Sequence, residues 1–131
     1  MRNLKQEPGS KNCVAVVAAM AFNCEVEEFE DFIGRKEGYR DSDFARFAIS
    51  KGFFVGMPFT HPNVDTDELV LKINVHDAPA YLIVEGESGE LHAVYWDGQN
   101  VWDPNPTAAD NKPLSEYNIF FWYTLLKLVD K

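Results

Sequence analysis

The stretch PAYLIVEGESGELHAVYWDGQNVWDP, residues 79–104, decides the fold because it predicts three β-strands joined by two tight turns. Each strand is rich in β-branched and aromatic residues, and each turn contains glycine. The strands are expected at 80–85, 91–96 and 100–103. Strands that follow one another through short turns pair as antiparallel neighbours, so this part of the chain predicts an antiparallel meander.

The second turn decides which side chains face each other. If 97–100 forms a four-residue turn, or 98–99 a two-residue one, His92 lies diagonal to Asp103 on one face of the sheet, within reach of a short carboxylate. A three-residue loop would change this register, and Asn105, or no residue, would then orient His92. The Asp-Pro-Asn-Pro stretch also fits a plain strand end, because all of these are common turn residues.

Three helices are expected upstream of the strands. The run at 14–22 is apolar almost all round and rich in alanine, which is typical of a buried central helix. Asn12 or Ser10 can cap it, so Cys13 falls in its first turn. The stretch at 26–33 has apolar residues at i, i+3, i+6 and i+7, which predicts an amphipathic helix with its acidic face in water.

The third helix is expected at 44–51, with a cap at 41–43 and a stop at Gly52. A β-rich stretch at 53–57 then predicts a strand that ends at Pro58. Three helices thus precede the first expected strand.

The remaining segments complete an α+β pattern. Residues 65–75 fit either a helix or an alternating strand, and the helix is favoured, whereas 117–128 predicts a final long strand or a strand pair. There is no internal repeat or linker. We therefore expect a single domain over 1–131, with N-terminal helices packed on an antiparallel β-sheet.

Composition narrows the classes of partner. With 131 residues, of which 46% are hydrophobic, the chain can build one real core. Its net charge of -9 argues against nucleic acid or an anionic membrane surface as a partner, because both are negatively charged. The oligomeric state is left open.

The sequence also predicts a cytoplasmic protein without membrane insertion. Residues 1–10 lack the apolar core of a secretory signal, and the longest apolar runs fall short of the roughly 20 residues that span a bilayer. Cys13 and Cys24 are therefore expected as free thiols. His61 and His76 have no metal-ligand spacing with a cysteine, so no metal and no cofactor are expected.

Cys13, His92 and Asp103 follow one another in the chain order of a nucleophile, its base and the group that orients the base. In the first turn of a helix, unpaired backbone N–H groups and the helix dipole stabilise a thiolate. The alternative for Cys13 is a small buried hydrophobic residue, which is also how we interpret Cys24.

Taken together, these features resemble the compact papain-like cysteine peptidases, and most closely the double-glycine leader peptidase domains of bacteriocin-exporting ABC transporters and their stand-alone relatives. The likeness rests on a glutamine shortly before a cysteine that opens an apolar helix, two further short helices, a Gly-Phe that leads into a strand, and then Pro-Ala-Tyr-Leu-Ile-Val, His-Ala-Val and Asp-Pro. It runs from about residue 6 to 106. The resemblance implies a papain-like fold with Cys13 as nucleophile, His92 as general base and Asp103 as the residue that orients it. It also implies Gln6 as an oxyanion-hole donor beside the Cys13 backbone N–H.

The chain departs from the family pattern at two points. Gln6 lies seven residues before Cys13 instead of the usual six, and Val14 follows Cys13 where glycine is usual. The extra residue falls in a stretch that contains Pro8-Gly9, which can form a bulge.

Three functional hypotheses follow. The first is a cysteine hydrolase that cleaves a peptide, isopeptide or related acyl bond in a peptide or protein substrate through a Cys-His-Asp triad. The second is a transglutaminase-like acyl transferase, which shares the order of the three residues and uses an amine instead of water. The third is a catalytically silent binding or structural module, such as an effector or virion-associated protein. A bacterial or phage origin agrees with the resemblance.

Overall fold

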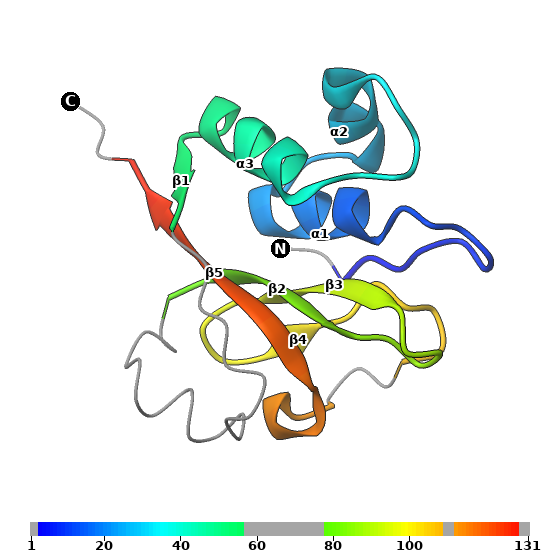
Figure 1. Cartoon of the computed structure of the whole chain (residues 1–131). Coiled ribbons are helices and arrows are strands. Elements are labelled where there is room, and N and C mark those ends of the chain that lie inside the picture. Colours follow the sequence, from blue (N-terminus) through cyan, green and yellow to red (C-terminus); the bar gives the residue numbers. More distant parts are fainter. Residues whose placement is uncertain (1–2, 57–77, 109–111, 129–131) are drawn as a thin grey trace.

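Three α-helices cover one face of a five-stranded antiparallel sheet in the computed structural model, which describes residues 3–56, 78–108 and 112–128 (Figure 1). The helices are α1 (Cys13–Phe22), α2 (Val26–Ile33) and α3 (Asp41–Ser50). The strands are β1 (Phe53–Val55), β2 (Ala80–Glu85), β3 (Leu91–Trp96), β4 (Val101–Trp102) and β5 (Ile119–Lys127), and a 3-10 helix, η1 (Leu114–Glu116), precedes β5. The expected α+β class, with N-terminal helices packed on an antiparallel sheet, is confirmed.

The first helix is the centre of the helical layer. Every residue of α1 from Val14 to Met20 is buried, because the helix packs against β3 on one side and α2 and α3 on the others. It begins at Cys13, which was expected in its first turn, and ends at Phe22, where Asn23 takes the left-handed conformation as the C-cap. The predicted bounds of α2 are confirmed.

The third helix begins earlier than predicted. Residues 41–43 were expected to precede it as a cap, but they form its first turn, and Arg40 occupies the N-cap position. The Asp43 carboxylate accepts the backbone N–H of Arg40 at 2.9 Å and forms ion pairs with Arg35 and Arg46. The Asp41 side chain in the same turn faces the sheet, where it accepts the hydroxyls of Tyr81 and Tyr123.

The sheet has the order β1-β5-β2-β3-β4. The expected meander of β2, β3 and β4 is confirmed, and the C-terminal segment forms one strand that inserts between β1 and β2. The strand expected to reach residue 57 ends at Val55 within the described chain. Residue 57 and the segment 65–75 lie outside the described residues.

The turn between β3 and β4 has the even length that places His92 diagonal to Asp103. Trp96 pairs with Val101, and the backbone N–H of Asp97 donates to the carbonyl of Asn100 at 3.1 Å. Gly98 has φ 99°, a conformation that disfavours any side chain. Local turn chemistry therefore sets the register that was expected from the sequence.

The last strand of the meander is shorter than predicted. The ladder was expected to cover 100–103, but only Val101 and Trp102 pair with β3. Pro104 has no N–H to donate, and the Asp103 carboxylate binds groups outside the ladder, so the chain leaves the sheet here.

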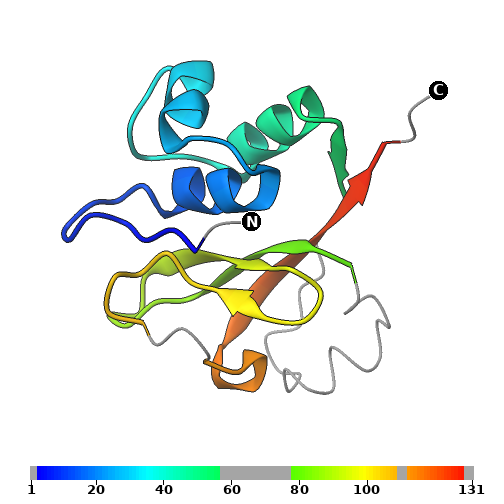
Figure 2. The ribbon, with the colours of Figure 1, turned by 180° about the vertical axis from the view of Figure 1, so that it is seen from behind.

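Both faces of the sheet are buried. On the helical side Phe44 stacks on Tyr81 with their ring centroids 4.1 Å apart, and on the other side Leu82, Val94 and Trp122 form a second core. Seen from behind in Figure 2, the chain before α1 runs past the same end of the sheet as the β2–β3 turn. Among the described helices, none is both long and apolar enough to cross a membrane.

Candidate active site

Cys13 and His92 lie together at the end of the sheet where the β2–β3 turn is found. Cys13 is the first residue of α1, and His92 is the second residue of β3, the strand that α1 packs against. Both line a groove of about 820 Å³, and Gln6 forms part of its wall. The structure thus brings four of the predicted site residues, these three and Asn105, to one cavity.

Among the described residues, no side chain caps the start of α1. Asn12 occupies the N-cap position as expected, but its side chain does not cap the helix; it accepts a hydrogen bond from the Ser10 hydroxyl at 2.6 Å instead. The prediction that Asn12 or Ser10 caps α1 is therefore correct in part. Asn12 is the N-cap residue, but the capping hydrogen bond from its side chain is not formed. The backbone N–H groups of the first turn, including that of Cys13, point toward the end of the helix where an anion is stabilised.

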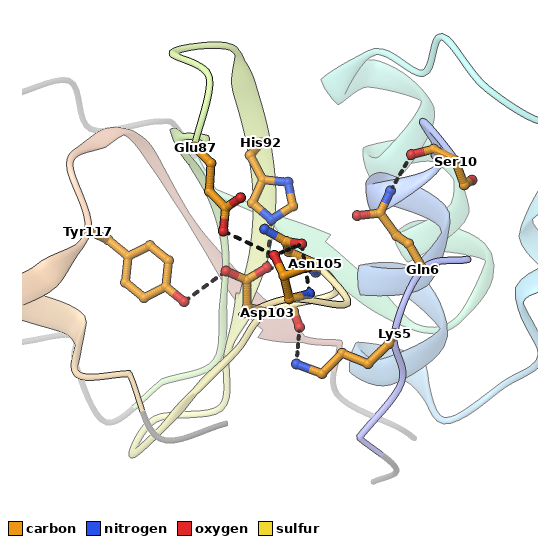
Figure 3. A network of polar contacts seen from close by, with 9 residues as sticks. Lys5, Gln6, Ser10, Glu87, His92, Asp103, Asn105 and Tyr117 are labelled. Atoms are coloured by element: carbon orange, nitrogen blue, oxygen red, sulfur yellow. Dashed lines mark hydrogen bonds and ion pairs between the residues drawn. The ribbon is translucent and has the colours of Figure 1, made fainter. Parts of the chain in front are cut away.

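His92 is held by Asp103. Its Nε2 lies 2.6 Å from Asp103 Oδ1, and the two side chains are only 13% and 6% exposed (Figure 3). The diagonal pairing expected from the sequence is confirmed. Because Nε2 is engaged by the carboxylate, Nδ1 is the ring nitrogen that remains for the thiol of Cys13.

The charge state of His92 follows from these neighbours. Burial lowers its pKa, but the hydrogen bond to Asp103 and the interaction with Cys13 outweigh burial and raise the pKa to about 9. At neutral pH the ring is therefore an imidazolium, which is the partner that a thiolate requires.

Asp103 is buried, and both oxygens of its carboxylate accept hydrogen bonds. Oδ1 accepts the backbone N–H of Asn105 at 2.8 Å, and Oδ2 accepts the Tyr117 hydroxyl at 2.9 Å (Figure 3). Burial raises the pKa of Asp103, whereas His92 and these donors together hold it below its ordinary value. The carboxylate is therefore ionised and fixed in place.

Asn105 does not take the orienting role that a different register would have given it. Its side-chain oxygen accepts from the backbone N–H and the hydroxyl of Thr107, each at 3.0 Å, and only its backbone N–H reaches Asp103. Asn105 thus supports the carboxylate through its backbone.

Gln6 is tied to the segment that follows Asp103. Its backbone N–H donates to the Pro104 carbonyl at 2.6 Å, and its side-chain Nε2 donates to the Ser10 carbonyl at 3.0 Å. A turn from Glu7 to Ser10, with Gly9 at φ 80°, lies in the stretch that holds the extra residue before Cys13. A primary amide has two N–H donors, so Gln6 can hold Ser10 and still donate into the groove.

Sequence reasoning missed Tyr117 and Lys5. Tyr117 belongs to an aromatic C-terminal run that predicted only a strand or a strand pair, although a hydroxyl in such a run signals a buried hydrogen-bond partner. Lys5 donates from Nζ to the backbone carbonyl of Asp103 at 2.8 Å, which further ties the N-terminal segment to the site.

The described residues hold no group of three or more His, Cys, Asp or Glu side chains that could bind a metal ion, and His61 and His76 lie outside them. Neither Cys13 nor Cys24 forms a disulfide. The chain matches no protein-family model and no curated protein sequence. The function is therefore argued from the geometry of the site.

Replacing Tyr117 with phenylalanine is expected to lower the free energy of unfolding by about 1 kcal/mol, because Asp103 Oδ2 loses a buried donor. Urea denaturation at pH 7 measures this loss. Tyr39→Phe, which removes a hydroxyl bonded to the Arg35 carbonyl at an exposed position, is the matched control. A loss no greater than that of the control would contradict the role given to Tyr117.

Proposed function

We propose that this protein is a papain-like cysteine hydrolase that cleaves a peptide, isopeptide or related acyl bond. One observation carries the proposal. Cys13 opens a helix beside His92, and the far nitrogen of His92 is bonded to a buried carboxylate, Asp103, at 2.6 Å. A nucleophile, a base and an orienting group in this order form the arrangement of a catalytic triad.

The first step is attack by Cys13. The imidazolium of His92, whose pKa is about 9, stabilises the thiolate, which adds to the carbonyl carbon of the bound acyl group. The negative charge then moves to the carbonyl oxygen. The Cys13 backbone N–H and the Gln6 side-chain amide are the donors proposed for this oxyanion, and one such donor stabilises the transition state by roughly 3–4 kcal/mol in other enzymes.

His92 carries the proton in both half-reactions. It gives its proton to the leaving amine as the tetrahedral intermediate collapses to a thioester on Cys13. The neutral ring then takes a proton from a water molecule as that water adds to the thioester. The intermediate collapses with the Cys13 thiolate as leaving group, which releases the carboxylic acid and restores the thiolate–imidazolium pair. Asp103 accepts the Nε2 hydrogen throughout, so Nδ1 faces the sulfur.

The test is a profile of peptides cleaved by the purified protein, read by mass spectrometry. We expect cleavage by the wild type and by Cys24→Ala, and none by Cys13→Ala. The two variants make the same change, but Cys13→Ala removes the proposed nucleophile, whereas the control Cys24→Ala removes a buried thiol outside the site. Product formation by Cys13→Ala would refute the hydrolase. A product in which an added amine replaces water would assign the transferase chemistry instead, and a wild type without turnover and with an unreactive Cys13 would favour the silent module.

A further inference from the structure

A second cavity opens on the helical side of the sheet, next to the Cys13–His92 pair. It has a volume of about 270 Å³ and is lined by both of these residues. Ile83 and Ala93 supply apolar walls, and Asp41 lies at its margin. Ligand pockets run to roughly 300–1,000 Å³, so this volume suits one side chain of a larger substrate.

Asp41 presents a fixed carboxylate to this cavity. Its Oδ1 accepts the hydroxyl of Tyr81 at 3.0 Å and its Oδ2 accepts the hydroxyl of Tyr123 at 2.7 Å. Burial, together with Asp41, raises the pKa of both tyrosines, so both hydroxyls remain donors. A carboxylate has about four acceptor positions, and these two hydroxyls occupy two of them.

The charge around the two cavities favours a cation. Lys11 and the protonated His92 are the cations among the described residues that line the smaller cavity, and Lys11 is an exposed side chain at its margin. The charge of His92 is balanced by Asp103. The larger groove carries three acidic side chains, Glu7, Glu87 and Glu90, beside the same two cations.

We propose that the smaller cavity, the Asp41 pocket, binds the lysine or arginine side chain of a substrate residue next to the scissile bond. The methylene stem lies against the apolar walls, and the charged end forms a hydrogen-bonded ion pair with Asp41. The two tyrosines hold the carboxylate in position, so little ordering is needed when the cation binds. This inference rests on the proposed function, because it makes the pocket a specificity subsite of the same cleft.

The test compares two reagents that alkylate Cys13, Nα-acetyl-lysine chloromethyl ketone and its norleucine analogue. In each case the thiolate displaces chloride and forms a thioether, which mass spectrometry locates and times. We expect the wild type to react about tenfold faster with the lysine reagent, which corresponds to about 1.4 kcal/mol. In Asp41→Asn the ratio of the two rates is expected to approach one, whereas Asp31→Asn, which removes the same charge from an exposed position on α2, is expected to retain the ratio.

Equal rates in the wild type, or an undiminished ratio in Asp41→Asn, would overturn the assignment. If Asp41→Asn does not fold, the wild type decides. We expect the order lysine, norleucine, glutamate among the three reagents, and a smaller lysine advantage in 1 M salt, because the half-buried Asp41 is partly screened there. Any other order overturns the proposal. The proposed function fails separately, when His92→Ala leaves the rates of all three reagents unchanged.

Discussion

Replacing His92 with alanine is expected to lower the turnover of a cleaved peptide by roughly 10²- to 10⁴-fold, because the variant loses its general acid and base. Alkylation of Cys13 at pH 7 by iodoacetamide is expected to slow by about 10- to 30-fold, since an isolated thiol is only a few per cent thiolate at this pH. The pH profile is expected to change as well. In the wild type the His92 imidazolium remains charged up to about pH 9, so the rate advantage of the wild type over the variant is expected below that pH and is expected to fall as the ring loses its proton.

Three controls isolate the effect. Cys24 is buried in the same molecule and reports any general loosening of the fold. Lys11→Ala removes another cation that lines the same groove without touching Asp103, and it is expected to leave the alkylation rate nearly unchanged. Far-UV circular dichroism confirms that the variants fold. Alkylation of Cys13 at the same rate with and without His92 would show that the two residues do not act as a pair.

What the sequence predicts well in this protein is local. Asp97 accepts the backbone N–H groups of Gln99 and Asn100 within its own turn, and Gly98 takes the conformation that other residues avoid. Those few residues decide the strand register and, with it, the contact of His92 with Asp103. The apolar run at 14–22 likewise predicts a buried helix from its own composition alone.

The contacts that sequence reasoning missed join distant parts of the chain. Tyr81 and Tyr123 reach Asp41 over separations of 40 and 82 residues, and Tyr117 reaches Asp103 only because the final strand enters the sheet beside β2. Sheet order is decided by packing among all the elements and not by the periodicity of any one of them. The predicted start of α3 was wrong for a related reason, because the Asp43 carboxylate pairs with Arg35, which lies in the loop before this helix.

The Asp103 carboxylate is the group on which both the fold and the chemistry of this end of the molecule depend. It is 6% exposed, and its oxygens bind His92, Asn105 and Tyr117 while its backbone carbonyl binds Lys5. Removing one charge of a buried pair leaves the other without compensation, and this usually costs roughly 3–5 kcal/mol. An asparagine keeps the shape of the side chain and one acceptor oxygen, so Asp103→Asn tests the charge more than the packing.

We therefore expect Asp103→Asn to lower the free energy of unfolding by about 3 kcal/mol at pH 6.5. The pKa of His92 is about 9 in the folded protein against 6.5 in the unfolded chain, so its contribution is fully present below pH 6.5 and is lost as the pH rises through 9. The pKa of Asp103 is lowered by folding, so its contribution is lost only as the pH falls below 3.8. The difference between wild type and variant is thus expected to shrink steadily from pH 6.5 to about 9, as measured by urea denaturation at each pH, while the difference for Asp31→Asn stays constant. A deficit in Asp103→Asn that does not change over this range would mean that the imidazolium is not the partner this carboxylate stabilises.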